Sequence, residues 1–255
     1  MRGLRTLLLP ALLCFPPLLN AQPDSGAVQV QVSGEVRRAG TIQISKGGRL
    51  ADVLHVAQPT AEAYLLGASL QREPEREAQM RQRAGLQYIL QQLPGHEDED
   101  VRRVGVQLDT WLRAHPATGR LRLMLERRLM QAQPLANPPA GSGDRILIPR
   151  RPQTVHLIGA LQAPCELPHD PLMDAPEYLA QCPVSAAADA DTLYVVQPDG
   201  LVQALGVAAW NRADPQAVAA GGTIYVPIRQ SALEQLDTAF NEEFASFVAT
   251  QPVEP

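Results

Sequence analysis

The 255-residue sequence has few of the features that usually mark a catalytic or membrane-spanning protein. Aromatic residues make up 4% of it, and no apolar run approaches the roughly 20 residues that a membrane helix needs. The histidines stand in no metal-ligand spacing and in no nucleophile motif. They are His55, His96, His115, His156 and His169. We therefore expect no metal, no cofactor and no catalytic residue. A carbohydrate-active enzyme stays open as the alternative, because the two carboxylates of a glycosidase have no fixed spacing in sequence.

The chain begins with a segment typical of a secretory signal peptide. Arg2 and Arg5 precede a Leu-rich stretch broken by prolines, and we predict cleavage after Ala21. A lipoprotein, anchored through Cys14, is the less favoured alternative because Leu13 stands where a small residue should precede a lipidated cysteine. The formal net charge of −5 becomes more negative once this segment is removed. An acidic protein gains nothing from counterion release, which argues against nucleic acid as a partner.

Cysteine is scarce, and two of the three residues lie in the predicted mature chain. Cys165 and Cys182 are close enough in sequence for a disulfide in an oxidising compartment, worth about 3 kcal/mol in the chain-entropy model. Two reduced, buried thiols are the alternative, because spacing alone does not show that the residues approach each other.

The stretch from Val30 to Leu54 has the pattern of a β-hairpin followed by a helix. Apolar residues alternate on both sides of a turn at 37–40, namely Val28, Val30, Val32, Ile42 and Ile44. After the break at Lys46-Gly47-Gly48, apolar residues continue at helical spacing, namely Leu50, Val53, Leu54 and Ala57. A hairpin covered by a helix is the start of a β-grasp fold.

A weaker copy of this pattern begins at Val155, so the chain contains an internal repeat. The segment 143–149 at the end of the first copy matches 221–227 at the end of the second. The second copy predicts strands at 155–161, 165–167, 192–196, 201–205 and 223–226, and a helix at 175–180. The first copy is longer by about 47 residues, which we interpret as an insertion.

The insertion has the periodicity of two helices. Residues 71–93 carry an apolar stripe of Met80, Leu86, Ile89, Leu90 and Leu93, and Pro94-Gly95 ends it. A second helix is predicted from Glu97 or Asp98 to Arg113, opened by acids that suit its N-terminus. Two helices joined by a short turn form an αα-hairpin. The alternating residues 120–125 then predict a strand that returns to the first unit.

The last element is an amphipathic helix predicted over 231–250. Ser231 and Glu234 form a capping-box pattern, and the residues on one side are Leu233, Leu236, Phe240, Phe244 and Phe247. The other side is acidic, which favours docking on protein over binding to anionic lipid. Packing on its own domains and binding to a partner both stay open.

Together these patterns predict an α+β protein with two tandem β-grasp domains. The predicted segments are a signal peptide (1–21), a first domain (22–152) with a helical-hairpin insertion at about 62–114, a second domain (153–229), and a terminal helix and tail (230–255). The order of these segments resembles the GfcC family of capsule and exopolysaccharide biosynthesis. The resemblance rests on the G-E-V and G-A-L openings at Gly34 and Gly159, the closing segments 143–149 and 221–227, the helical insertion, and Q-P-D-G followed by W-N at Trp210-Asn211.

The resemblance implies a soluble periplasmic protein built from soluble-ligand-binding β-grasp (SLBB) units. It implies an accessory or adaptor role in polysaccharide assembly or export, with a polysaccharide or an outer-membrane export protein as partner. Related units occur in Wza-like export channels, where a terminal amphipathic helix helps form the pore. Outer-membrane association through the terminal helix and a pore-lining role are therefore the alternatives. The chain departs from those channels in having no convincing lipid-attachment cysteine and no polysaccharide-export domain before Val28.

We expect a sugar-binding cleft between the first β-grasp unit and the helical hairpin. Arg72, with Arg76 one helical turn further on, is a candidate bidentate contact for an acidic sugar. The alternative is that both arginines pair with the neighbouring glutamates.

Aromatic residues supply the other candidates for sugar binding. Tyr64, Trp111 and Trp210 offer stacking faces, or else they are core or interface residues. Asn211 matches the family pair, and we expect it to fix its loop through bonds between its side chain and the backbone.

Overall fold

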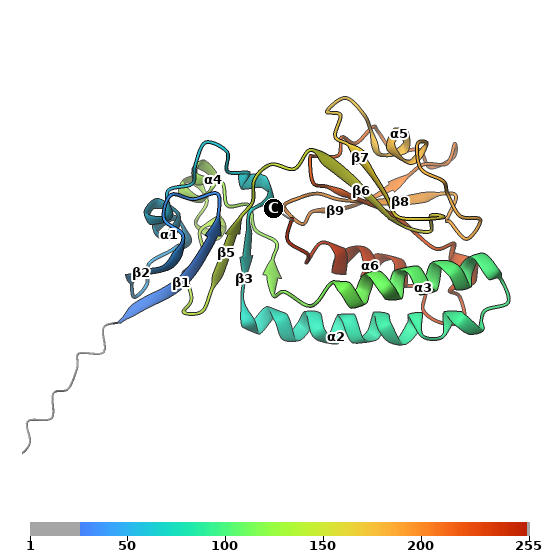
Figure 1. Ribbon diagram of the computed structural model, residues 1–255, viewed down its shortest axis with the longest axis horizontal. Coiled ribbons are helices and arrows are strands. Elements are labelled where there is room, and N and C mark those ends of the chain that lie inside the picture. Colours follow the sequence, from blue (N-terminus) through green and yellow to red (C-terminus); the bar gives the residue numbers. More distant parts are fainter. Residues whose placement is uncertain (1–25, 254–255) are drawn as a thin grey trace, which may run out of the picture.

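The computed structural model describes residues 26–253, and the predicted signal peptide lies outside them. The chain forms two five-stranded sheets with the same topology (Figure 1). The first contains β1 (Ala27–Gly34), β2 (Gly40–Ser45), β3 (Ser69–Gln71), β4 (Arg120–Leu121) and β5 (Arg145–Ile148), in the order β2-β1-β5-β3-β4. The second contains β6 (Thr154–Gly159), β7 (Cys165–Pro168), β8 (Thr192–Val196), β9 (Val202–Gly206) and β10 (Thr223–Val226), in the order β7-β6-β10-β8-β9.

In both sheets the first and last strands pair in parallel at the centre, and the other pairs are antiparallel. This is the β-grasp order, so the predicted α+β fold with two tandem β-grasp units is confirmed. The six α-helices are α1 (Leu50–Ala57), α2 (Glu73–Leu90), α3 (Glu99–Ala114), α4 (Arg127–Ala132), α5 (Ala175–Leu179) and α6 (Phe240–Val248). Among the described residues, no helix is both long and apolar enough to cross a bilayer.

The first unit has its own core between the sheet and α1. The inward side chains of the alternating strands meet the apolar side of α1, as the sequence pattern predicts. The buried residues include Val30, Val32, Ile42, Ile44, Leu50, Val53 and Leu54. α4, which the sequence did not predict, adds Met130 to this core, together with Leu125 from the preceding segment.

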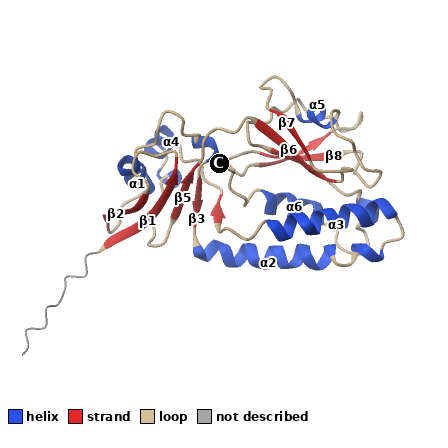
Figure 2. Ribbon diagram, in the orientation of Figure 1, coloured by secondary structure: helices blue, strands red, loops and turns tan. Residues whose placement is uncertain are grey.

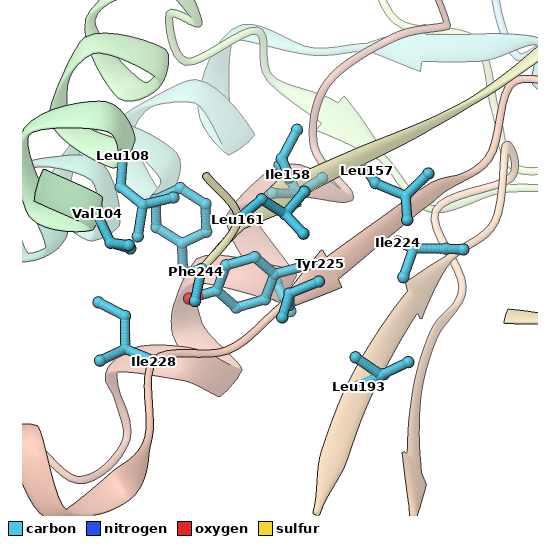
Figure 3. Packing of buried hydrophobic residues seen from close by; sticks show 14 of the residues in the cluster. Val104, Leu108, Leu157, Ile158, Leu161, Leu193, Ile224, Tyr225, Ile228 and Phe244 are labelled. Atoms are coloured by element: carbon cyan, nitrogen blue, oxygen red, sulfur yellow. The ribbon is translucent and has the colours of Figure 1, made fainter. Parts of the chain in front are cut away.

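The helical hairpin α2–α3 is inserted in the first unit but packs on the second. Its apolar stripe, which includes Leu86, Leu90, Val104, Leu108 and Leu112, belongs to the same core as β6, β8, β10 and α6. Figure 2 shows the two long helices running alongside the second sheet, away from the first. In Figure 3, Val104 and Leu108 of α3 lie beside Phe244 of α6 and Tyr225 of β10. The insertion therefore joins the two units.

Two predicted elements and one predicted core residue differ from the structure. The strand predicted over 120–125 pairs only at Arg120-Leu121, because the chain then leaves the sheet and buries Leu125 in the first core. The terminal helix is α-helical only over α6, and Ser231 lies instead in a 3₁₀ turn at Gln230–Ala232. Met80, predicted on the buried stripe of α2, is 45% exposed. The neighbouring Gln79 is buried in its place.

Gln79 is buried because its side-chain amide has two backbone partners. Its Nε2 donates to the carbonyl of Arg120 at 2.9 Å, and its Oε1 accepts the N–H of Gly119 at 2.7 Å. A buried amide is tolerated when both of its polar ends are paired. Helical periodicity alone does not reveal such a partner.

Candidate functional site

The structure holds α6 between the second sheet and the helical hairpin (Figure 1). Phe240, Phe244 and Phe247 on its inner side are fully buried. The ring of Phe244 stacks on Tyr225, with centroids 5.0 Å apart, and its centroid lies 5.4 Å from that of Trp111 on α3. Aromatic pairs at these distances add to the stabilisation that burial alone supplies. We call this assembly of α6, the hairpin and the second sheet the clasp.

A buried asparagine fixes α6 in register within the clasp. The Oδ1 of Asn241 accepts the hydroxyl of Tyr225 at 2.9 Å and the N–H of Ile228 at 3.1 Å. Its Nδ2 donates to the carbonyl of Ile228 at 2.7 Å. Burial raises the pKa of Tyr225 well above its ordinary value, so this hydroxyl stays protonated and donates.

Polar contacts tie both helices of the hairpin to the second unit and α6. Asp98, at the start of α3, accepts the backbone N–H groups of Asp100 and Val101 and pairs with Arg229 at 2.6 Å. The hydrogen bond from Arg229 is the largest cause of the lowered pKa of Asp98. On α2, the Nε2 of Gln82 donates to the carbonyl of Glu243 at 2.9 Å. The clasp is therefore bonded at several points along its length.

Arg120 of β4 lies in the seam between the two units and is only 5% exposed. Its guanidinium donates to the carbonyls of Gln251 at 2.5 Å, of Ala249 at 3.4 Å, and of Pro198. Burial lowers its pKa to about 10, an effect that the charge of Asp199 opposes. The guanidinium is therefore charged at neutral pH, and it is solvated by backbone carbonyls from the second unit and the tail.

Tyr64 also lies in this seam. Its hydroxyl donates to the carbonyl of Ala220 at 2.9 Å, and the guanidinium of Arg151 stands 5.7 Å from the centre of its ring. Burial is the largest cause of its raised pKa. Tyr64 therefore connects the two units, which fits the alternative of an interface residue better than that of a stacking face for sugar.

The two candidate arginines at the start of α2 have partners within the protein. Arg72 forms a bidentate ion pair with Asp144, through Nε at 2.9 Å and Nη2 at 2.8 Å. The Asp144 side chain is 4% exposed. Arg76 pairs with Glu73 at 3.3 Å and donates to the carbonyl of Ala117 at 3.3 Å. The geometry gives both arginines a structural role.

Trp210 and Asn211 lie on the loop after β9. Trp210 is exposed, whereas Asn211 is held by hydrogen bonds. The Trp210 side chain is 77% exposed. The Oδ1 of Asn211 accepts the N–H of Ala208, and its Nδ2 donates to the carbonyl of Asp191, both at 3.0 Å. These are side-chain bonds to the backbone of the kind expected for Asn211. The loop is thus held firmly while its tryptophan faces solvent.

The predicted site residues do not converge on one cleft. They fall at the start of α2, in the seam between the units, and on the loop after β9. A disulfide joins Cys165 of β7 to Cys182 after α5. Among residues 26–253, no group of three or more histidine, cysteine or acidic side chains is placed to hold a metal ion.

Two hollows lie on the first unit. An apolar cavity of about 230 Å³ is lined by Ala51, Leu54, Pro59, Thr60, Ala63, Leu65, Leu125 and Met130. A larger groove of about 700 Å³ lies between β2 and α1.

Sequence reasoning missed the two residues that organise the clasp and the seam. Arg120 alternates with leucines, a pattern that normally places a charged residue on the exposed face of a strand. Asn241 directly follows Phe240, which lies on the apolar side of the helix. This position was the only sign in the sequence that Asn241 is buried.

Comparison with known proteins relates the chain to capsule biosynthesis. Residues 163–252 match the family described as Capsule biosynthesis GfcC C-terminal. The resemblance to the GfcC family is confirmed over these residues. Uncharacterized protein YjbG of Escherichia coli (strain K12) is 27% identical over 221 residues, which cover 83% of this chain and 90% of YjbG. The part that matches GfcC runs from the turn before β7 through α6, so it contains Trp210 and Asn241 but not the hairpin.

Proposed function

We propose that this protein is a periplasmic accessory protein of capsule or exopolysaccharide assembly and export, and that it acts by binding. The observation that carries the proposal is the match of residues 163–252 to the capsule biosynthesis family. The architecture supports a binding role, because the hairpin and the seam hold two β-grasp units and α6 together as one scaffold. A rigid scaffold presents its exposed loops in fixed positions, which lowers the entropic cost of binding a partner.

Trp210 is the residue that we assign to glycan contact. A large side chain that is 77% exposed on a loop held by Asn211 is preorganised, because the loop has little freedom left to lose. The face of an indole ring is apolar and packs against the C–H face of a sugar ring, while its N–H donates to a hydroxyl. The same loop geometry without an exposed aromatic residue would offer a glycan much less contact area.

The short length and the burial of α6 favour an accessory protein over a pore-lining subunit. α6 has 9 residues, whereas a membrane-spanning helix needs about 20. Its aromatic side is already covered by the hairpin and the second sheet. For α6 to enter a membrane the clasp would have to open and expose Phe240, Phe244 and Phe247.

Deleting the gene and measuring surface glycan tests the role in the cell. We expect loss or mislocalisation of the surface polysaccharide, with recovery when the full-length gene is supplied in trans. An unchanged amount and chain length of surface glycan would contradict the proposal.

A binding assay with purified polysaccharide tests the mode of action. Titration of the mature protein with the host's own capsular oligosaccharide should give saturable heat without release of reducing ends. The Trp210→Ala variant should bind at least fivefold more weakly, whereas Tyr88→Ala, which removes an exposed aromatic ring from α2, should bind like the wild type. Sustained release of reducing ends would support the carbohydrate-active enzyme instead.

A further inference from the structure

We propose that the groove between β2 and α1 binds an extended acidic segment of a partner protein, which adds to the first sheet as a further strand beside β2. The groove is lined by Gly26, Ala27, Gln43, Ile44, Ser45, Lys46, Gly48, Asp52, His55 and Val56. It lies at the sheet edge that faces away from the clasp and the seam, so this site is separate from the proposed glycan contact at Trp210.

The backbone of β2 is available for pairing. On β1, the carbonyl of Gln29 accepts the N–H of Gly143, and the N–H of Gln31 donates to the backbone carbonyl of Asp144. The backbone N–H and C=O groups of the odd-numbered residues of β1 therefore point toward β5. The backbone groups of the even-numbered residues of β1 point toward β2, where Val28 is paired with Ile44 and Val30 with Ile42.

It follows that Thr41 and Gln43 of β2 point their N–H and C=O groups away from the sheet. β2 is the edge strand, and within residues 26–253 no hydrogen bond to these four groups is found. Unpaired groups in a row are a template for an incoming strand. The adjoining groove of about 700 Å³ supplies space for the side chains of that strand.

The walls of the groove combine an apolar floor with a polar rim. Ile44 is 8% exposed and Val56 of α1 is half-buried, so they form the floor. Lys46 and His55 are exposed at the rim. The carboxylate of Asp52 is turned toward the start of α1, where it accepts the backbone N–H of Arg49 at 2.7 Å. A strand with alternating apolar and acidic side chains matches this arrangement.

The charge of the surrounding segment selects an acidic partner. Between Glu35 and Asp52 the sequence contains Arg37, Arg38, Lys46 and Arg49 and no acid, although the whole chain has a net charge of −5. Glu35 is paired with Arg150 at 3.1 Å. Edge-to-edge pairing with a second copy would bring two such basic segments together, and like charges in close contact are unfavourable. The occupant is therefore an acidic strand of another protein.

Hydrogen exchange with a defined peptide tests the proposal directly. The probe is the peptide acetyl-EVDVEV-amide, and the control is acetyl-KVRVKV-amide. With the acidic peptide bound to the ¹⁵N-labelled mature protein, we expect the amides of Thr41 and Gln43 to exchange at least tenfold more slowly, whereas the basic peptide should change neither. Slow exchange at both amides before any peptide is added would mean that the edge is already paired, and would overturn the proposal.

Two substitutions separate strand pairing from charge attraction. Gln43→Pro removes an outward N–H, which an edge strand tolerates, and should weaken binding of the acidic peptide about tenfold. Gln43→Ala keeps the N–H and should bind like the wild type. Lys46→Glu should weaken binding severalfold, and Arg81→Glu on the exposed side of α2 should have no effect. If Gln43→Pro fails to fold, the exchange experiment and Lys46→Glu still decide the question.

Cross-linking locates the bound peptide, because Lys46 is the only lysine in the sequence. Carbodiimide should join a carboxylate of the acidic peptide to Lys46, as identified by mass spectrometry. Equal binding of the peptide to wild type and Gln43→Pro, or its full displacement by polygalacturonate, would show a site for polyanions in general and overturn strand addition. Concentration-dependent dimers that Gln43→Pro abolishes would assign the edge to a second copy and overturn the acidic partner.

Discussion

Replacing Arg120 with methionine tests whether this one side chain holds the seam between the two units. Methionine keeps much of the aliphatic length of arginine but donates no hydrogen bond. The substitution removes the donor that three carbonyls share, those of Pro198, Ala249 and Gln251. These carbonyls belong to the β8–β9 turn and to the tail after α6, so the loss weakens the attachment of β4 to the second unit and the tail.

The expected cost follows from the geometry. Hydrogen bonds to a charged group contribute about 1.5–3 kcal/mol each after desolvation is counted. The bond to Ala249 at 3.4 Å adds little, so only the bonds to Pro198 and Gln251 are counted. Two such bonds give a loss of about 3–6 kcal/mol in the free energy of unfolding. For a chain of this size that corresponds to a fall of roughly 10 °C in Tm.

Thermal unfolding followed by tryptophan fluorescence measures the loss and shows where it acts. The variant is made in a Trp210→Phe background, so that Trp111, whose ring lies 5.4 Å from Phe244 in the clasp, is the only tryptophan. Arg122→Met, which changes an exposed arginine two residues away, is the matched control and should unfold like its parent. A Tm for Arg120→Met within 2 °C of the parent, or an equal fall for Arg122→Met, would refute the reasoning.

Three further predictions concern the clasp and the second unit. Phe244→Ala removes a fully buried ring and should lower the free energy of unfolding by about 3–5 kcal/mol in urea titrations, whereas a loss below 1 kcal/mol would mean that the clasp is loosely packed. The pKa of Tyr225 is raised in the folded state, so its contribution to stability is complete below the ordinary pKa of 10 and is lost as the pH rises above it. In urea titrations between pH 8 and 11, Tyr225→Phe should therefore lose less stability than the wild type, and parallel curves would contradict this. Changing both Cys165 and Cys182 to serine should cost about 3 kcal/mol for the 17-residue separation, and an equal loss on adding dithiothreitol to the wild type checks that the disulfide is the cause.

Local periodicity was enough to predict most of the fold. The strand expected at 223–226 is β10, and the two inserted helices begin and end close to the predicted residues. These elements could be predicted because alternation and helical spacing depend on which side of an element faces a core, and each sheet and the hairpin have one such side. The internal repeat also predicted that the two units share one topology, because two copies of one sequence pattern imply two copies of one strand order.

The partners of each element could not be predicted in the same way. The stripe on α2 and α3 shows that the hairpin is buried on one side, but not that the second unit covers it. Arg72 is matched to Asp144, which lies 72 positions later, and no local signal connects them. The capping pattern at Ser231 predicted a helix start, but the chain forms a 3₁₀ turn there and the α-helix begins only at Phe240. Local sequence patterns do not encode such long-range partners, which depend on how distant segments pack together.

The docking of the inserted hairpin on the second unit also orders the events of biogenesis. The hairpin leaves the ribosome well before β10 and α6, the last parts of its cover, have been made. A product that stops short of α6 carries an exposed stripe of leucines and valines, which invites aggregation. The nine-residue helix α6 therefore covers the last of this stripe only after the hairpin and both sheets have been made.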